Sequence, residues 1–109
     1  MGKQQQVITF DNPLQQQHKY TLRLFVTGAS PNSLRAISNL KGICETYLKD
    51  NYELEIIDVH QQPLIAGREQ IIALPLLIKK SPDPERRLIG DMSDINRVLR
   101  GLGLVVVNA

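Results

Sequence analysis

The stretch Tyr-Thr-Leu-Arg-Leu-Phe-Val-Thr-Gly-Ala-Ser-Pro-Asn-Ser, residues 20–33, predicts a strand, a tight turn and the start of a helix. Leu22, Leu24 and Val26 alternate with the residues between them, which is the two-residue period of a strand. Gly28 permits the sharp turn that follows. Ser30 is a good helix cap, and the proline after it has the backbone angle of a first helical turn.

Length and composition indicate one small globular domain. The chain has 109 residues, of which 42% are hydrophobic and 22% charged. The net charge of +2 is too small to predict a nucleic-acid surface. The single cysteine, Cys44, excludes an internal disulfide and any Cys-x-x-Cys redox or metal motif. No apolar run approaches the ~20 residues of a membrane span, and the N-terminus lacks the apolar core of a secretion signal. We therefore expect a cytoplasmic protein with no cofactor, bound to neither nucleic acid nor membrane.

The first half of the chain gives a consistent pattern. Residues 31–49 carry apolar side chains three and four positions apart, which predicts a helix with one apolar face. Cys44 lies on that face and is expected to be a buried small hydrophobe rather than a reactive thiol. Residues 52–59 predict a second strand, and apolar residues on both of its faces favour a central position in the sheet. Together these elements predict a right-handed β-α-β unit with parallel strands.

The second half and the N-terminus are less regular. The pattern allows a short helix over 64–72, strands over 73–80 and 85–89, and a helix over 93–100 capped by Ser93. The β-branched run 104–107 prefers a strand but has no obvious place in this fold. Residues 1–19 are expected to form a flexible extension of a domain spanning 20–109, with a short strand over 7–10 as the alternative.

Two sites that contain serine are candidates for chemistry. Ser30 and Ser33 have the spacing of the Cys-x-x-Cys pair at the corresponding corner of a thioredoxin, but His18 and His60 lie outside this corner, so a helix cap is favoured over a nucleophile. Asp91-Met92-Ser93 resembles the acidic-Ser pair with which glutathione-binding thioredoxin relatives hold the amino end of the peptide. A helix cap is again the favoured interpretation.

Four runs of sequence resemble the KaiB family of small clock proteins. They are Leu-Phe-Val-Thr-Gly-Ala-Ser-Pro-Asn-Ser (24–33), Ile-Ile-Asp-Val (56–59), Ala-Leu-Pro-Leu-Leu (73–77) and Arg-Arg-Leu-Ile-Gly-Asp-Met-Ser (86–93). The similarity extends from about Tyr20 to Leu102. It implies an α/β fold of the thioredoxin-like superfamily that lacks redox cysteines and has no catalytic activity.

The resemblance also implies a metamorphic protein that switches between two folds. The β-α-β first half is constant, while the second half is α-β-β-α in a thioredoxin-like monomer and β-α-α-β in a dimer or tetramer. Conflicting local signals over residues 63–107 are consistent with two packings of similar free energy. In the monomer Pro75 would take the cis-proline position, and prolines near the switch would slow interconversion. We expect the oligomer to be the resting state. The fold-switch residues that we assign are Pro75, Pro82, Pro84, Gly101 and Gly103.

The partners implied by the resemblance are the ATPase ring of KaiC or a KaiC-like protein, then KaiA or an output histidine kinase. The implied surface covers the second strand and second helix, about residues 53–70. The pairs Lys79-Lys80 and Arg86-Arg87 suggest a basic patch that binds an acidic partner. The candidate partner-binding residues are Glu53, Glu55, Asp58, Arg68, Gln70, Lys79, Arg86 and Arg87.

The sequence departs from the clock pattern at several positions. The family's three prolines are Pro82-Asp83-Pro84 here, its threonines beside the key proline are Leu74 and Leu76, and Gly103 replaces an aspartate. The acidic tail is absent. These changes suggest a divergent paralogue that serves a KaiC-like ATPase or a stress response. A glutathione-binding or transferase-like module that uses Ser30 is the alternative of a different class.

Overall fold

A computed structural model describes residues 6–10 and 19–108 of the chain. Its elements are β1 (Gln6–Phe10), β2 (Tyr20–Val26), α1 (Pro31–Ile43), a π-helical turn η2 (Cys44–Leu48), β3 (Tyr52–Asp58), α2 (Pro63–Arg68), β4 (Leu76–Ser81), β5 (Arg86–Ile89), α3 (Ile95–Gly101) and β6 (Leu104–Asn108). From β2 to α3 the order is β-α-β-α-β-β-α, which is the order expected for the thioredoxin-like form. The second half does not have the β-α-α-β order in this structure.

Strands β2 to β5 form one mixed sheet in the order β3-β2-β4-β5. β2 and β3 are parallel, as the β-α-β pattern predicts, while β4 is antiparallel to both β2 and β5. The predicted central position of residues 52–59 is wrong, because β2 is central and β3 lies at the edge. Exposed Glu53 and Glu55 fit this edge position, and Ile57 is the buried residue of the strand.

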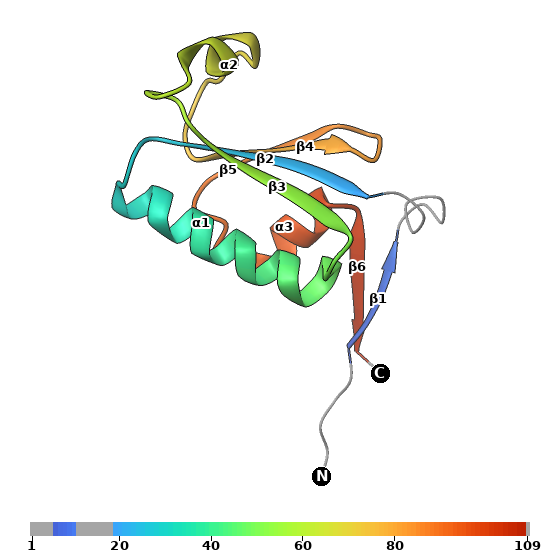
Figure 1. Cartoon of the computed structure of the whole chain (residues 1–109). Helices are drawn as coiled ribbons and strands as arrows, with labels where there is room; N and C mark the ends of the chain where they lie inside the picture. Colours follow the sequence, from blue (N-terminus) through green and yellow to red (C-terminus); the bar gives the residue numbers. More distant parts are fainter. Residues whose placement is uncertain (1–5, 11–18, 109) are drawn as a thin grey trace.

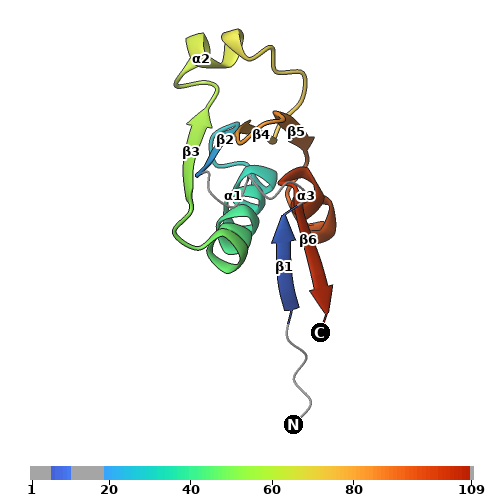
Figure 2. The ribbon, with the colours of Figure 1, turned by 90° about the vertical axis from the view of Figure 1, so that its right-hand side faces the viewer.

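The main core lies between one face of the sheet and the helices α1 and α3 (Figure 1). Leu22, Leu24 and Val26 of β2 project into it, as their alternation predicts. Cys44 is fully buried there, and this burial raises the pKa of its thiol to about 12, so the prediction of a buried small hydrophobe is confirmed. α2 lies on the opposite side of the sheet from α1 and α3 in two perpendicular views (Figures 1 and 2).

Three details differ from, or sharpen, the predicted boundaries. α3 is capped by Asp94, whose carboxylate accepts a hydrogen bond from the Arg97 amide at 3.1 Å, so the predicted Ser93 cap is wrong by one residue. β4 begins directly after Pro75, and the Leu74–Pro75 peptide is cis, as the resemblance implies. The peptides before Pro82 and Pro84 are also cis.

The ends of the described chain form a second, two-stranded sheet. β1 pairs antiparallel with β6, with Val7 opposite Val107 and Phe10 opposite Leu104. Residues 104–107 thus form the strand that their sequence predicts, and β1 is the neighbouring strand that the sequence pattern did not identify. It also matches the alternative of a short strand over 7–10 rather than the favoured flexible segment, whereas residues 11–18 lie outside the described part of the chain.

Candidate interaction surface

The second face of the sheet, opposite α1 and α3, is only partly covered. An apolar cluster of Phe25, Ile57, Leu76 and Ile78 is buried at one end of this face. α2 and the segment after it cover the cluster with partly buried apolar side chains, including those of Ile65, Ile71 and Leu74. Beside this cluster the same face carries charged side chains from four strands. We call this whole face of the sheet, opposite α1 and α3, the open face.

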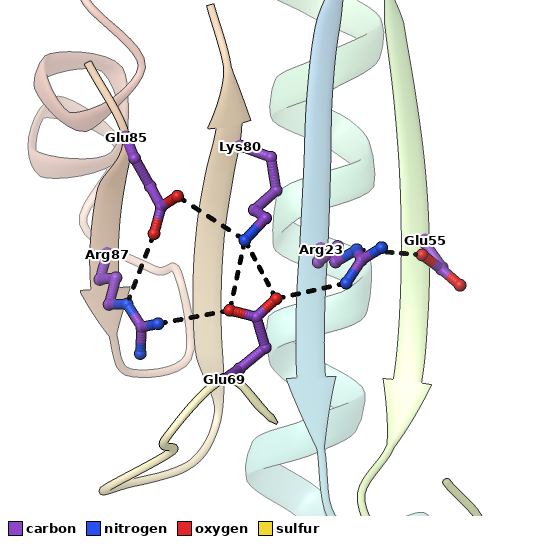
Figure 3. A network of polar contacts seen from close by, with 6 residues as sticks. All are labelled: Arg23, Glu55, Glu69, Lys80, Glu85 and Arg87. Atoms are coloured by element: carbon purple, nitrogen blue, oxygen red, sulfur yellow. Dashed lines mark hydrogen bonds and ion pairs between the residues drawn. The ribbon is translucent and has the colours of Figure 1, made fainter. Parts of the chain in front are cut away.

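A partly buried carboxylate is the hub of the charged part of the open face (Figure 3). Glu69 follows α2 directly, and its side chain is only 12% exposed. Its carboxylate lies 3.3 Å from the Arg23 guanidinium of β2, 3.0 Å from the Lys80 ammonium of β4 and 3.4 Å from the Arg87 guanidinium of β5. One side chain therefore joins the connection after α2 to three neighbouring strands.

Two more carboxylates extend this arrangement outward. Arg23 Nε lies 3.3 Å from Glu55 on the edge strand β3. Glu85 lies 3.6 Å from Lys80 and 3.9 Å from Arg87. Glu55 and Glu85 are about half exposed, so their pairs are well solvated and add little stability. The open-face network thus consists of Arg23, Glu55, Glu69, Lys80, Glu85 and Arg87, three positive and three negative groups.

The structure brings Glu55 and Arg87 together in this network, but the other predicted binding residues lie around it. Glu53 is exposed on β3 and pairs with Lys19 at 3.6 Å. Asp58 ends β3 and accepts a hydrogen bond from the His60 amide at 2.9 Å. Arg68 and Gln70, on either side of Glu69, are both exposed.

The predicted basic patch is not formed, because the alternation of the strands separates each pair of neighbours. Lys79 is 2% exposed and faces the main core, with its ammonium 6.0 Å from the centre of the Tyr20 ring. Lys80, one residue later, points to the open face. Arg86 pairs in register with Lys79, whereas Arg87 pairs with Ile78 and shares the open face with it. Two successive basic residues in a strand therefore place one positive charge on each face of the sheet and do not form a single basic patch.

Sequence reasoning did not single out Arg23 or Glu69. Arg23 is the one charged residue within β2, and its position between Leu22 and Leu24 marks it for the face opposite the main core. That signal was available in the sequence. Glu69 follows a short helix whose end the pattern did not define, so the approach of its carboxylate to three strands depends on tertiary packing.

The serine corner is built as a helix cap. The Ser30 hydroxyl accepts a hydrogen bond from the Ser33 amide at 3.2 Å and lies 2.8 Å from the Ser33 hydroxyl. Ser33 is buried and accepts a hydrogen bond from the Thr27 amide at 3.1 Å. Within residues 19–108, neither hydroxyl makes a hydrogen bond with a histidine or carboxylate. The predicted cap role of Ser30 is confirmed.

The acidic-Ser pair before α3 is engaged in local contacts. The Ser93 amide donates to the Asp91 carboxylate at 3.0 Å, and Arg35 Nε lies 3.4 Å from the same group. Hydrogen bonds from Ser93, with a smaller contribution from Arg35, hold the pKa of Asp91 below its usual range.

In the described part of the chain, no group of three or more His, Cys, Asp or Glu side chains is arranged to hold a metal ion. No helix there is long and apolar enough to cross a membrane.

The sequence model of one domain family, the KaiB domain, matches residues 23–104. The chain belongs to the KaiB family. The circadian clock oscillator protein KaiB of a Picosynechococcus strain is 49% identical over 86 residues, which cover 79% of this chain and 83% of that protein. The circadian clock protein KaiB3 of a Synechocystis strain is 48% identical over 88 residues, 81% of this chain and 86% of that one.

Solved structures confirm a thioredoxin-like fold for this KaiB-family chain. The N-terminal domain of Synechococcus elongatus SasA superposes with a TM-score of 0.63 at 24% identity, covering 78% of this chain and 84% of that domain. Mitochondrial thioredoxin 3 of Saccharomyces cerevisiae gives a TM-score of 0.62 at 16% identity, covering 80% and 82%. At such identities the likeness concerns the fold alone.

Proposed function

We propose that this KaiB-family protein is a non-catalytic regulator that binds the ATPase ring of KaiC, or of a KaiC-like protein, and changes its phosphorylation cycle or output. The observation that carries the proposal is a pair of highly exposed apolar side chains, one in α2 and one in the segment after it, on either side of Glu69 in the sequence. Leu64 in α2 is 78% exposed, and Ile72 in the connection to β4 is 95% exposed. Large apolar side chains held in water next to charged groups are typical of a protein-binding surface.

The binding surface of this proposal consists of α2, the segment 69–74 and the open face. Leu64 and Ile72 would supply the desolvated contacts, while Glu55 and Arg87 would lie at the polar rim. The charged network has equal numbers of positive and negative groups, so its role would be orientation rather than attraction of an acidic partner. KaiA or an output histidine kinase would be further partners, and a homo-oligomer in the other fold would be the resting form.

A pull-down of the full-length protein against the KaiC-like ATPases of its host, with ADP and ATP compared, tests this function. Ile72→Ser and Leu64→Ser should each weaken capture of the ATPase at least ~10-fold, because a buried apolar anchor contributes about 1.5–3 kcal/mol. Leu34→Ser is the matched control, since Leu34 is 53% exposed on α1, on the other side of the sheet.

Two outcomes would contradict the proposal. Failure of the wild-type protein to bind any of these ATPases under either nucleotide would remove the function itself. Equal weakening by Leu34→Ser and Ile72→Ser would place the contact somewhere other than the surface around α2. Circular dichroism of each variant confirms that it is folded before binding is measured.

A further inference from the structure

The segment between α2 and β4 alternates between side chains that face the sheet and side chains that face water. Glu69, Ile71 and Leu74 face the sheet, where the carboxylate joins the open-face network and the two apolar side chains pack against the buried cluster. Gln70 and Ile72 are exposed, and Ile72 is 95% exposed. The inward contacts of its neighbours therefore keep the side chain of Ile72 in water.

The exposure of Ile72 needs a constraint. A large apolar side chain gains free energy when it leaves water, and the segment covers a buried apolar cluster. Ile71, the preceding residue, already packs against that cluster. A segment that was free to turn would therefore sample orientations in which Ile72 approaches the sheet. Contacts made elsewhere in the segment have to fix the outward orientation.

The backbone around Glu69 does not fix this orientation by itself. α2 is a short helix of six residues, none of which is buried, and it ends at Arg68. Gln70 has a φ of 53°, in the left-handed region that residues other than glycine rarely adopt. Such a conformation persists only where the surrounding contacts impose it. Tertiary contacts thus maintain the turn of the chain that follows Glu69.

Glu69 makes contacts that can fix the orientation. Its carboxylate lies 3.0 Å from Lys80 of β4, and it also contacts Arg23 of β2 at 3.3 Å and Arg87 of β5 at 3.4 Å (Figure 3). Partners on three neighbouring strands restrain a carboxylate in direction as well as in position. Ile72 is only three residues further, at most about 10 Å along an extended chain. Fixing the carboxylate therefore limits the directions in which Ile72 can point.

We propose that Glu69 is a positioning residue of the partner-binding surface, because its contacts with three cations keep Ile72 turned outward. This role rests on the proposed function, since the partner is the KaiC-like ATPase that Ile72 would contact. Glu69 is 12% exposed and Ile72 95% exposed, so the isoleucine meets the partner and the carboxylate acts through it. An anchor that is ordered before binding gives tighter binding, because less conformational freedom is lost when the complex forms.

A double-mutant cycle on capture of the ATPase separates positioning from general destabilisation. Glu69→Gln should raise the dissociation constant at least ~5-fold in the wild-type background. In the Ile72→Ser background the same change should raise it less than ~2-fold, because the side chain that Glu69 positions is already gone. Glu69→Asp keeps the negative charge and should bind more tightly than Glu69→Gln.

Glu85→Gln is the matched control for this cycle. It makes the same chemical change in the same network, at a carboxylate that contacts Lys80 and Arg87 but does not belong to the segment after α2. It leaves Glu69 in place, so it should change the dissociation constant less than ~2-fold. Circular dichroism confirms that each variant is folded before binding is measured.

A measurement of mobility tests the restraint without any partner. A nitroxide label is attached to Ile72→Cys and read by electron paramagnetic resonance, while Cys44 can remain because burial raises the pKa of its thiol to about 12. Glu69→Gln should shorten the rotational correlation time of the label at least ~2-fold. Salt at about 1 M, which screens charges beyond about 3 Å, should shorten it in the same direction without that substitution. A label at Leu34→Cys on α1 should respond to neither change.

Two results would overturn the positioning role and leave the proposed function standing. They are a label at position 72 whose mobility Glu69→Gln does not change, and a loss of capture by Glu69→Gln that is equally large with and without Ile72. Failure of the wild-type protein to bind any KaiC-like ATPase would overturn the proposed function and the positioning role together, even if the label moved as expected. The mobility of the label therefore tells the two failures apart.

Discussion

Glu69 is the residue on which the open face depends most. Its carboxylate is 12% exposed and contacts three cations, so replacing it removes the common partner of all three. Glu69→Gln should lower the free energy of unfolding by about 1–3 kcal/mol, the range for losing charged contacts in a partly buried site. Glu53→Gln, which affects a single pair with a 69% exposed carboxylate, should change it by less than about 0.5 kcal/mol. Urea unfolding measures both, and equal effects would contradict the hub role.

Ser30 gives a second residue-level prediction. Ser30→Ala removes the oxygen that accepts the Ser33 amide and should cost about 1 kcal/mol in urea unfolding. Ser30→Gly should cost only a few tenths of that, because glycine tolerates the cap position. Ser38→Ala is the control on the exposed side of α1 and should be neutral or slightly stabilising. A larger loss in Ser30→Gly than in Ser30→Ala would argue against a cap.

The thiol of Cys44 gives a third prediction, about reactivity with pH. Burial raises its pKa to about 12, so almost no thiolate exists at pH 8 in the folded protein. A thiol reagent should modify Cys44 only after urea unfolds the chain, when the pKa returns to about 8.5. Folding stability should be highest below that unfolded value and should fall as the pH rises from it toward 12, because the unfolded state loses its proton first. Rapid labelling of the native protein would contradict this burial.

At the scale of elements, the segment after α2 covers part of the open face, and its position depends on charged contacts more than that of any other covering segment. α2 has no fully buried residue, so the segment is held by Glu69 and by partly buried contacts with the apolar cluster. Trypsin cleavage after Arg68 should therefore increase several-fold between low salt and about 1 M salt, where screening acts over about 3 Å. Cleavage after Lys41 in α1 should not change. Trypsin should cleave the Glu69→Gln variant rapidly after Arg68 at every salt concentration. If cleavage of the wild-type protein did not depend on salt, this would contradict the inference that charged contacts hold the segment in place.

The elements also show what the sequence could predict. The periodicity of residues 20–59 predicted β2, the helix of α1 and η2, and the parallel β3, because each depends on local alternation. The position of β3 at the sheet edge could not be read in this way, since Leu54 and Ile57 look the same whether one neighbour strand is present or two. The network was hidden for a related reason. It joins Arg23, Glu69 and Arg87 from separate parts of the chain, and only the tertiary register brings them together.

At the scale of the whole molecule, the valine run no longer favours one fold over the other. The run suits the β-α-α-β form, whose last element is a strand, whereas the thioredoxin-like order expected from the sequence ends in a helix. Pairing with β1 gives the run a place there too, so residues 104–108 are a strand in the thioredoxin-like arrangement as well. The resting fold therefore remains a prediction. NMR of the free protein tests it, since helical chemical shifts over 95–101 would report the thioredoxin-like order and contradict a resting state in the other fold.

The two-stranded ribbon of β1 and β6 also brings the first and last described strands of the chain side by side. Gln6 and Asn108 are neighbours across the two strands, so a loop of two to five residues between them would form an ordinary hairpin. New ends could then be opened in the exposed turn at residues 83–84, between β4 and β5. Such a circular permutant would keep every strand pair of the present structure, and it would allow a fusion partner to be attached at the β4–β5 turn.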